Sequence, residues 1–72
     1  MTHHVYSVTE IVGSSHEGVD DAIRNAVGRA AETVRHLEWF QVTEVRGQIK
    51  DGHVEHVQVG LKVGFRLEEP AR

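Results

Sequence analysis

The side chains in this 72-residue chain that could do chemistry are one tryptophan, six histidines and eleven carboxylates. Trp39 offers the largest flat apolar face of any side chain, and such a face can fill a core or stack on a flat ligand. It follows the only long helical pattern and precedes the only clear hairpin turn. Two interpretations are therefore open, a core plug and an exposed stacking platform.

The histidines raise the question of a metal site. His53 and His56 are three residues apart in an extended pattern, so we expect their side chains to point to opposite faces and not to chelate together. His3 and His4 lie near the amino terminus, which we expect to be poorly ordered. We therefore predict no metal site and interpret the histidines as surface residues. The absence of cysteine excludes thiolate sites, disulfides and cysteine nucleophiles.

Three carboxylates, Glu10, Glu44 and Glu55, could serve as general acids or bases. Such chemistry needs two groups near each other and a nucleophile or an activated water. No pattern in the sequence places two of these residues together with a nucleophile. A hydrolase is therefore not indicated.

Size and charge narrow the class of protein. We expect one domain over residues 1–72, and a domain this small buries only about 60–65% of the surface of its unfolded chain. The formal charge of −3 argues against a broad basic face for nucleic acid. No apolar run approaches the ~20 residues that span a bilayer, and the polar start is not a signal peptide. We expect a cytoplasmic protein, which fits the absence of cysteine.

One amphipathic helix is predicted over about residues 16–36, with a length of about 30 Å. Its apolar stripe has spacings of three or four and consists of Val19, Ala22, Ile23, Ala26, Val27, Ala30, Val34 and Leu37. Ser14 and Glu17 have the spacing of a capping box, with Ser15 as the alternative N-cap. Gly28 lies inside this helix and costs up to ~1 kcal/mol relative to alanine.

Three segments are typical of β-strands. Residues 5–12 are rich in β-branched side chains, residues 39–48 follow the helix, and residues 54–67 alternate strictly. The alternation predicts one helix-facing row, Val57, Val59, Leu61, Val63, Phe65 and Leu67. Asp51-Gly52 between the last two strands favours a type I′ turn. We predict an α+β fold of order β-α-β-β, a three-stranded antiparallel sheet with one helix across one face.

A two-residue turn also predicts the register of this hairpin. It places eight residues on the face away from the helix, with Trp39 opposite Gly64, Thr43 opposite Gly60 and Val45 opposite Gln58, together with Gln41 and Lys62. Trp39 and Gln58 are then about 20 Å apart, so they can line one small pocket only if neighbouring subunits each supply one. Arg46 falls on the helix side unless a bulge near Gly47 turns it over.

The predicted sheet is too long for its helix. At about 3.3 Å per residue the third strand is about 45 Å long, and three strands leave two exposed edges. A helix of about 30 Å cannot cover such a sheet. We therefore expect a homo-oligomer in which other subunits cover the rest.

The sequence resembles the dodecins, a family of small flavin-binding proteins of β-α-β-β fold that assemble as hollow, roughly spherical dodecamers. The resemblance extends over about residues 6–67. Its motifs are residues 10–15, 21–23, 37–40, 45–47 and 58–65, which read EIVGSS, DAI, LEWF, VRG and QVGLKVGF. Together at these spacings they are specific, whereas each alone is weak.

The resemblance implies pairs of flavins, FMN and/or riboflavin, held at a two-fold axis between subunits of a homododecamer. It implies that Trp39 stacks on the isoalloxazine ring and that Gln58 hydrogen-bonds the polar edge of the pyrimidine ring. Arg46 would meet the FMN phosphate or the ribityl chain. The residue types suit these roles, because an indole stacks, an amide both donates and accepts, and a guanidinium binds phosphate. Coenzyme A is a possible second ligand.

The function implied by the resemblance is flavin storage, buffering and photoprotection, without enzymatic activity. A flavin packed between Trp39 and a second flavin has no face free for a substrate or an electron donor. Two alternatives stay open. One is a structural assembly module without a ligand, which would be colourless and would not bind flavin. The other is a flavin-dependent redox enzyme.

Overall fold

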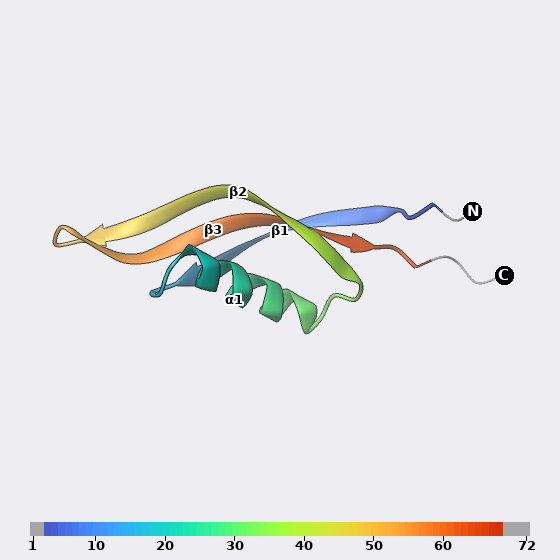
Figure 1. Ribbon diagram of the computed structural model, residues 1–72, viewed down its shortest axis with the longest axis horizontal. Helices are drawn as coiled ribbons and strands as arrows, with labels where there is room; N and C mark the ends of the chain where they lie inside the picture. Colours follow the sequence, from blue (N-terminus) through green and yellow to red (C-terminus); the bar gives the residue numbers. More distant parts are fainter. Residues whose placement is uncertain (1–2, 69–72) are drawn as a thin grey trace.

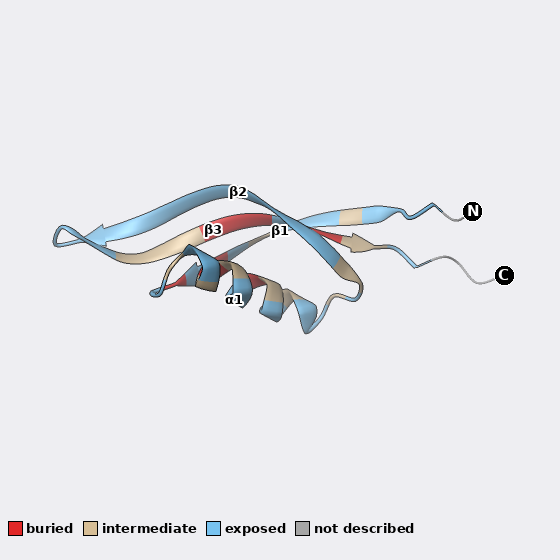
Figure 2. Cartoon of the chain, viewed as in Figure 1, coloured by how far each residue is buried: buried red, intermediate tan, exposed pale blue. Residues whose placement is uncertain are grey.

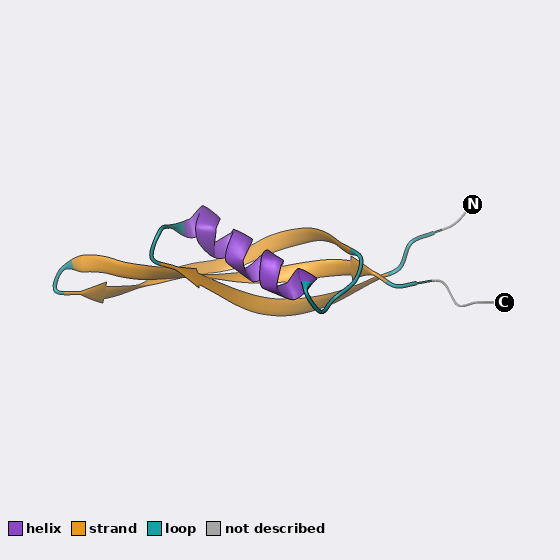
Figure 3. Ribbon diagram, turned by 90° about the horizontal axis from the view of Figure 1, so that it is seen from below, coloured by secondary structure: helices purple, strands orange, loops and turns teal. Residues whose placement is uncertain are grey.

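The computed structural model describes residues 3–68 and has the predicted order β-α-β-β (Figure 1). The elements are β1 (Tyr6–Ser15), α1 (Val19–Ala31), β2 (Leu37–Lys50) and β3 (His53–Arg66). The strands form one antiparallel sheet in the order β1-β3-β2, so β3 is central and β1 and β2 are the edges. Helix α1 lies across one face of this sheet (Figure 3). The α+β prediction is confirmed.

Helix α1 is shorter than predicted, and the predicted cap is wrong. It begins at Val19 after the N-cap residue Gly18, and no side chain caps it. The hydroxyl of Ser15 is used in the preceding loop, where it accepts from the Glu17 N–H at 2.8 Å and donates to Asp21 at 2.6 Å. The helix ends at Ala31, and the chain reaches β2 through residues 32–36, where His36 has a φ of 65°.

The core lies where α1 meets β1 and β3 (Figure 2). It consists of Ala22 and Ala26 from the helix and Val59, Leu61 and Val63 from β3. These three β3 residues belong to the predicted row, whose remaining members are half-buried or, at Leu67, exposed. Alanines on the helix let the backbones approach closely. The core is therefore confined to the part of the sheet that α1 covers.

The turn between β2 and β3 is of the predicted kind. Asp51 has a φ of 52° and Gly52 a φ of 78°, and Lys50 pairs with His53. Positive φ at both central residues is the geometry that the Asp-Gly pair favours. The turn-proximal end of the hairpin therefore has the predicted register.

The register of the hairpin shifts by one residue between the Ile49–Val54 pair and the Gln48–His56 pair. Glu55 of β3 is extra and has no partner in the ladder, so Arg46 pairs with Gln58 where Val45 was predicted. A shift of one residue moves a side chain to the other face of the sheet. Arg46 therefore lies on the same face as Gln58, and Val45 lies on the helix side. The regular register predicted for Val45 and Arg46 is therefore wrong. A bulge does turn Arg46 over, but its extra residue is Glu55 on β3 and does not lie at Gly47.

A second shift compensates the first. Thr43 is the extra residue on β2, so Glu44 and not Thr43 pairs with Gly60. Beyond it the original register returns, and Trp39 pairs with Gly64 as predicted. These two irregularities leave the turn and the Trp39–Gly64 pair in the predicted register and change which residues between them share a face. A third shift follows at Glu38, which is an extra residue on β2, so Leu37 pairs with Phe65.

Much of β2 is uncovered. Helix α1 packs on β1 and β3, and every residue of β2 except Leu37 is exposed. The exposed side chains on its helix side include Phe40, Val42 and Val45, which are 40–53% accessible.

Within residues 3–68, no helix is both long and apolar enough to cross a membrane.

Candidate functional site

The face of the sheet away from α1, called the outer face below, carries Trp39. The indole is 41% exposed and does not belong to the core. It lies directly over Gly64, where an added Cβ would overlap the ring. The core-plug interpretation is therefore wrong for the single chain, and the sheet presents a flat aromatic surface to the outside.

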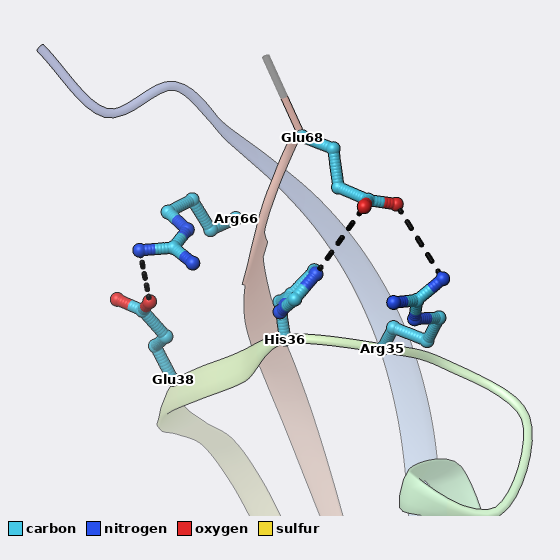
Figure 4. A network of polar contacts seen from close by, with 5 residues as sticks. All are labelled: Arg35, His36, Glu38, Arg66 and Glu68. Atoms are coloured by element: carbon cyan, nitrogen blue, oxygen red, sulfur yellow. Dashed lines mark ion pairs between the residues drawn. The ribbon is translucent and has the colours of Figure 1, made fainter. Parts of the chain in front are cut away.

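The chain just before Trp39 is held by polar contacts. Tyr6 donates a hydrogen bond of 2.9 Å to the Glu38 carboxylate. Arg66 pairs with the same carboxylate at 3.8 Å (Figure 4). The hydrogen bond to the Glu38 carboxylate raises the pKa of Tyr6 above its ordinary value, because the carboxylate accepts the hydroxyl proton and disfavours a second negative charge beside it. The ring of Tyr6 also lies 6.4 Å from that of Trp39.

The same close-up contains a second small network. Glu68 lies between Arg35 and His36, with N–O separations of 3.7 and 3.8 Å (Figure 4). These side chains join the segment after β3 to the connection between α1 and β2. Because the arginine and glutamate are exposed, the pairs orient the chain more than they stabilise it.

Gln58 and Arg46 touch each other on the outer face. The Arg46 Nε donates to the Gln58 Oε1 at 2.9 Å. The same guanidinium pairs with Glu44, which is the residue opposite Gly60. The guanidinium therefore has two polar partners on its own chain, and its charge is partly balanced by a carboxylate.

The structure brings two of the three predicted site residues together and leaves the third apart. Arg46 and Gln58 are in contact, whereas Trp39 pairs with Gly64, six residues along β3 from Gln58. At the rise of a strand this separation is about 20 Å. All three side chains share the outer face, but one chain does not gather them around a single small ligand.

Sequence reasoning missed two residues of this face. Tyr6 reaches Trp39 because both β1 and β2 pair with β3. On β1, Val8 lies beside Gly64, the partner of Trp39, and Tyr6 lies two residues further along. Glu44 reaches Arg46 because the shift at Thr43 turns it outward. A hairpin signal reports only on neighbouring strands. No local pattern announces a pairing with β1 or an extra residue in a ladder.

The expected faces of the two histidines near the turn are wrong. His53 pairs with Lys50 and His56 with Gln48, and the two partners are two residues apart on β2. Alternation therefore puts both histidines on the outer face. The cause is again Glu55, the extra residue between them.

His56 also contacts His16, which follows β1. Their ring centroids are 5.6 Å apart with an interplanar angle of 72°, and the His16 Nδ1 lies 3.0 Å from the Glu55 carbonyl oxygen. In the part of the chain from 3 to 68, no three histidine or carboxylate side chains are grouped to hold a metal ion.

Comparison with known families identifies a relationship over nearly the whole chain. The family model described as Dodecin matches residues 5–68. A curated protein named Dodecin from Thermus thermophilus is 54% identical over 65 residues, which cover 90% of this chain and 94% of that protein. Both the length and the identity of this match are sufficient to establish the family.

Solved structures of dodecins also match this chain. The structure of dodecin from Streptomyces coelicolor is 66% identical with a TM-score of 0.90, and the match covers 97% of this chain and all of that one. A more distant match, 27% identical with a TM-score of 0.77, is a calcium-chelating immunodominant antigen from Mycobacterium tuberculosis, called calcium dodecin. It covers 93% of this chain and 99% of that one.

Proposed function

Because this chain belongs to the dodecin family, we propose that it is a flavin-binding protein that stores and buffers FMN or riboflavin and protects it from light. The observation that carries the proposal is the indole of Trp39, exposed and flat on the outer face above a glycine. A planar aromatic ligand can stack there without displacing any core residue.

The three site residues take separate roles in this proposal. Trp39 stacks on the isoalloxazine ring, Gln58 hydrogen-bonds the polar edge of the pyrimidine ring, and Arg46 meets the phosphate or the ribityl chain. Because Trp39 and Gln58 are about 20 Å apart on one chain, each ligand takes them from different subunits. A complete site therefore requires the assembly.

We further propose that the assembly is a homododecamer of single-domain subunits. The uncovered surfaces support an assembly of this kind. Within the described residues 3–68 both edges of the sheet are unpaired, and Phe40, Val42 and Val45 are exposed beside the helix. Unpaired edges and exposed apolar rows are surfaces that subunits cover in oligomers.

Membership of the dodecin family establishes the fold of this chain but does not by itself identify its ligand. One family member is named for calcium, so the ligand must be argued from the residues of this chain. The exposed indole and the amide–guanidinium pair suit a flavin and its polar edge, whereas a calcium ion prefers several oxygen ligands. Coenzyme A, whose phosphates would also suit a guanidinium, is a possible second ligand.

A fluorescence titration tests the function. We expect the ligand-free protein to quench added FMN and riboflavin fluorescence to a sharp end point, because an indole stacked on the ring quenches its excited state. Two flavins at each two-fold axis correspond to one flavin per chain. Bovine serum albumin at the same concentration controls for nonspecific quenching. Unquenched fluorescence with both flavins would instead support a ligand-free assembly module.

Sedimentation tests the assembly. We expect one species of about twelve chains at micromolar concentration, with no folded monomer, because a single chain leaves both sheet edges and the apolar side of β2 in water. Sedimentation velocity with and without FMN measures the mass. A folded monomer or dimer under both conditions would contradict the proposal and would leave the exposed edges unexplained.

A further inference from the structure

The contact between Arg46 and Gln58 determines which way the Gln58 amide points. A guanidinium has five N–H donors and no acceptor, so the amide atom that faces it must be the oxygen. The Arg46 Nε lies 2.9 Å from the Gln58 Oε1. The amide NH₂ must then point away from the guanidinium. Without the arginine, the amide could rotate by 180° and exchange its donor for its acceptor.

We propose that Arg46 is a positioning residue for Gln58, which holds the amide so that its NH₂ donates to a carbonyl oxygen of the flavin pyrimidine ring. This inference rests on the proposed flavin function and adds to the phosphate role. The positive charge beside the Oε1 also polarises the amide and strengthens the NH₂ as a donor. Arg46 therefore acts on every flavin, including those without a phosphate.

Glu44 completes the arrangement by holding the arginine. The guanidinium uses its Nε for Gln58 and its Nη1 for the Glu44 carboxylate. Both side chains are about half exposed, so the ion pair serves orientation more than stability. Among residues 3–68 the Nη2 group has no hydrogen-bond or ion-pair partner, so it can meet a phosphate. One arginine can therefore orient the amide and bind FMN at the same time.

Riboflavin separates the two roles, because it carries no phosphate. We expect Arg46→Ala to lower the affinity for riboflavin about three- to tenfold, which is the range that one net hydrogen bond contributes, and to lower the affinity for FMN more. Arg46→Lys should restore part of the FMN affinity through its charge. The lysine variant should recover less of the riboflavin affinity, because an ammonium lacks the planar fork that aligns with the Gln58 Oε1 and with Glu44 together.

A double-mutant cycle tests whether the effect passes through Gln58. In a Gln58→Ala background the amide is gone, so Arg46→Ala should change riboflavin affinity less than twofold, yet should still weaken FMN. Arg35→Ala is the matched control, since it removes an exposed arginine that pairs with Glu68 at a distance from Gln58. Fluorescence titrations measure affinity, and sedimentation checks that each variant assembles.

The outcomes are distinct. Unchanged riboflavin affinity in Arg46→Ala, or an equal loss in both backgrounds, would overturn the positioning role while the flavin function stands. If the unaltered protein binds neither flavin, the proposed function fails and this inference fails with it. A loss for riboflavin that disappears in the Gln58→Ala background supports the role.

Discussion

Trp39→Ala is expected to lower the affinity for both FMN and riboflavin by about thirtyfold or more, while the assembly stays intact. The figure corresponds to about 2 kcal/mol, the loss typical of removing an aromatic residue that dominates a binding site. The ring is 41% exposed and contributes nothing to the core between α1 and the sheet. Its removal should therefore cost binding and not folding.

The measurement is a fluorescence titration of each flavin, together with sedimentation of the variant. Trp39→Phe is the control, because a smaller ring still stacks and should lose no more than about tenfold. At a given protein concentration, the alanine variant should quench less of the flavin fluorescence, because it binds less flavin. If Trp39→Ala instead fails to assemble, or binds flavin as well as the unaltered protein does, the stacking role is wrong.

Gly13→Ala is expected to destabilise the fold by about 2–3 kcal/mol, which is a large share of the stability of a small domain. An added Cβ at this position would overlap the carbonyl oxygen of Ala22 and would lie 2.7 Å from the Ala26 Cβ. Because the first of these atoms is backbone, no side-chain rotation relieves the overlap. The helix would have to move away from the sheet and open the core.

Gly28→Ala is the matched control, with an effect of the opposite sign. No atom in the described part of the chain lies within 4 Å of a Cβ added there, and Gly28 is in the helix interior. Alanine should therefore stabilise the helix by up to about 1 kcal/mol. Thermal unfolding at one protein concentration compares the two, and each kcal/mol corresponds to about 4–8 °C in a domain of this size. A Gly13 variant as stable as the Gly28 variant would contradict the packing.

The sequence alone determined the order of the elements, the turn and the row that faces the helix. Each of these depends on a local rule. Asp51-Gly52 favours positive φ whatever surrounds it, and the alternation around Leu61 has a period of two that a strand imposes. The exposed position of Trp39 followed from the same count, since its pair with Gly64 is unaffected by the two compensating shifts.

The sequence pattern did not predict where the helix ends. The stripe runs on to Leu37, but the helix ends at Ala31 and Leu37 begins β2. An apolar side chain satisfies the same period whether it reaches the core from a helix or from a strand. The length of the connection that the chain needs to reach β2 decides between them, and this length is a tertiary property.

Only the tertiary structure decided which side of the sheet Arg46 occupies and what it touches. A face is assigned by counting residues from the turn, so a single extra residue reverses every assignment beyond it. The extra residue at Glu55 puts Arg46 beside Gln58, and the one at Thr43 turns Glu44 toward the same guanidinium. Such irregularities come from how the twisted hairpin packs as a whole, and no short stretch of sequence encodes them.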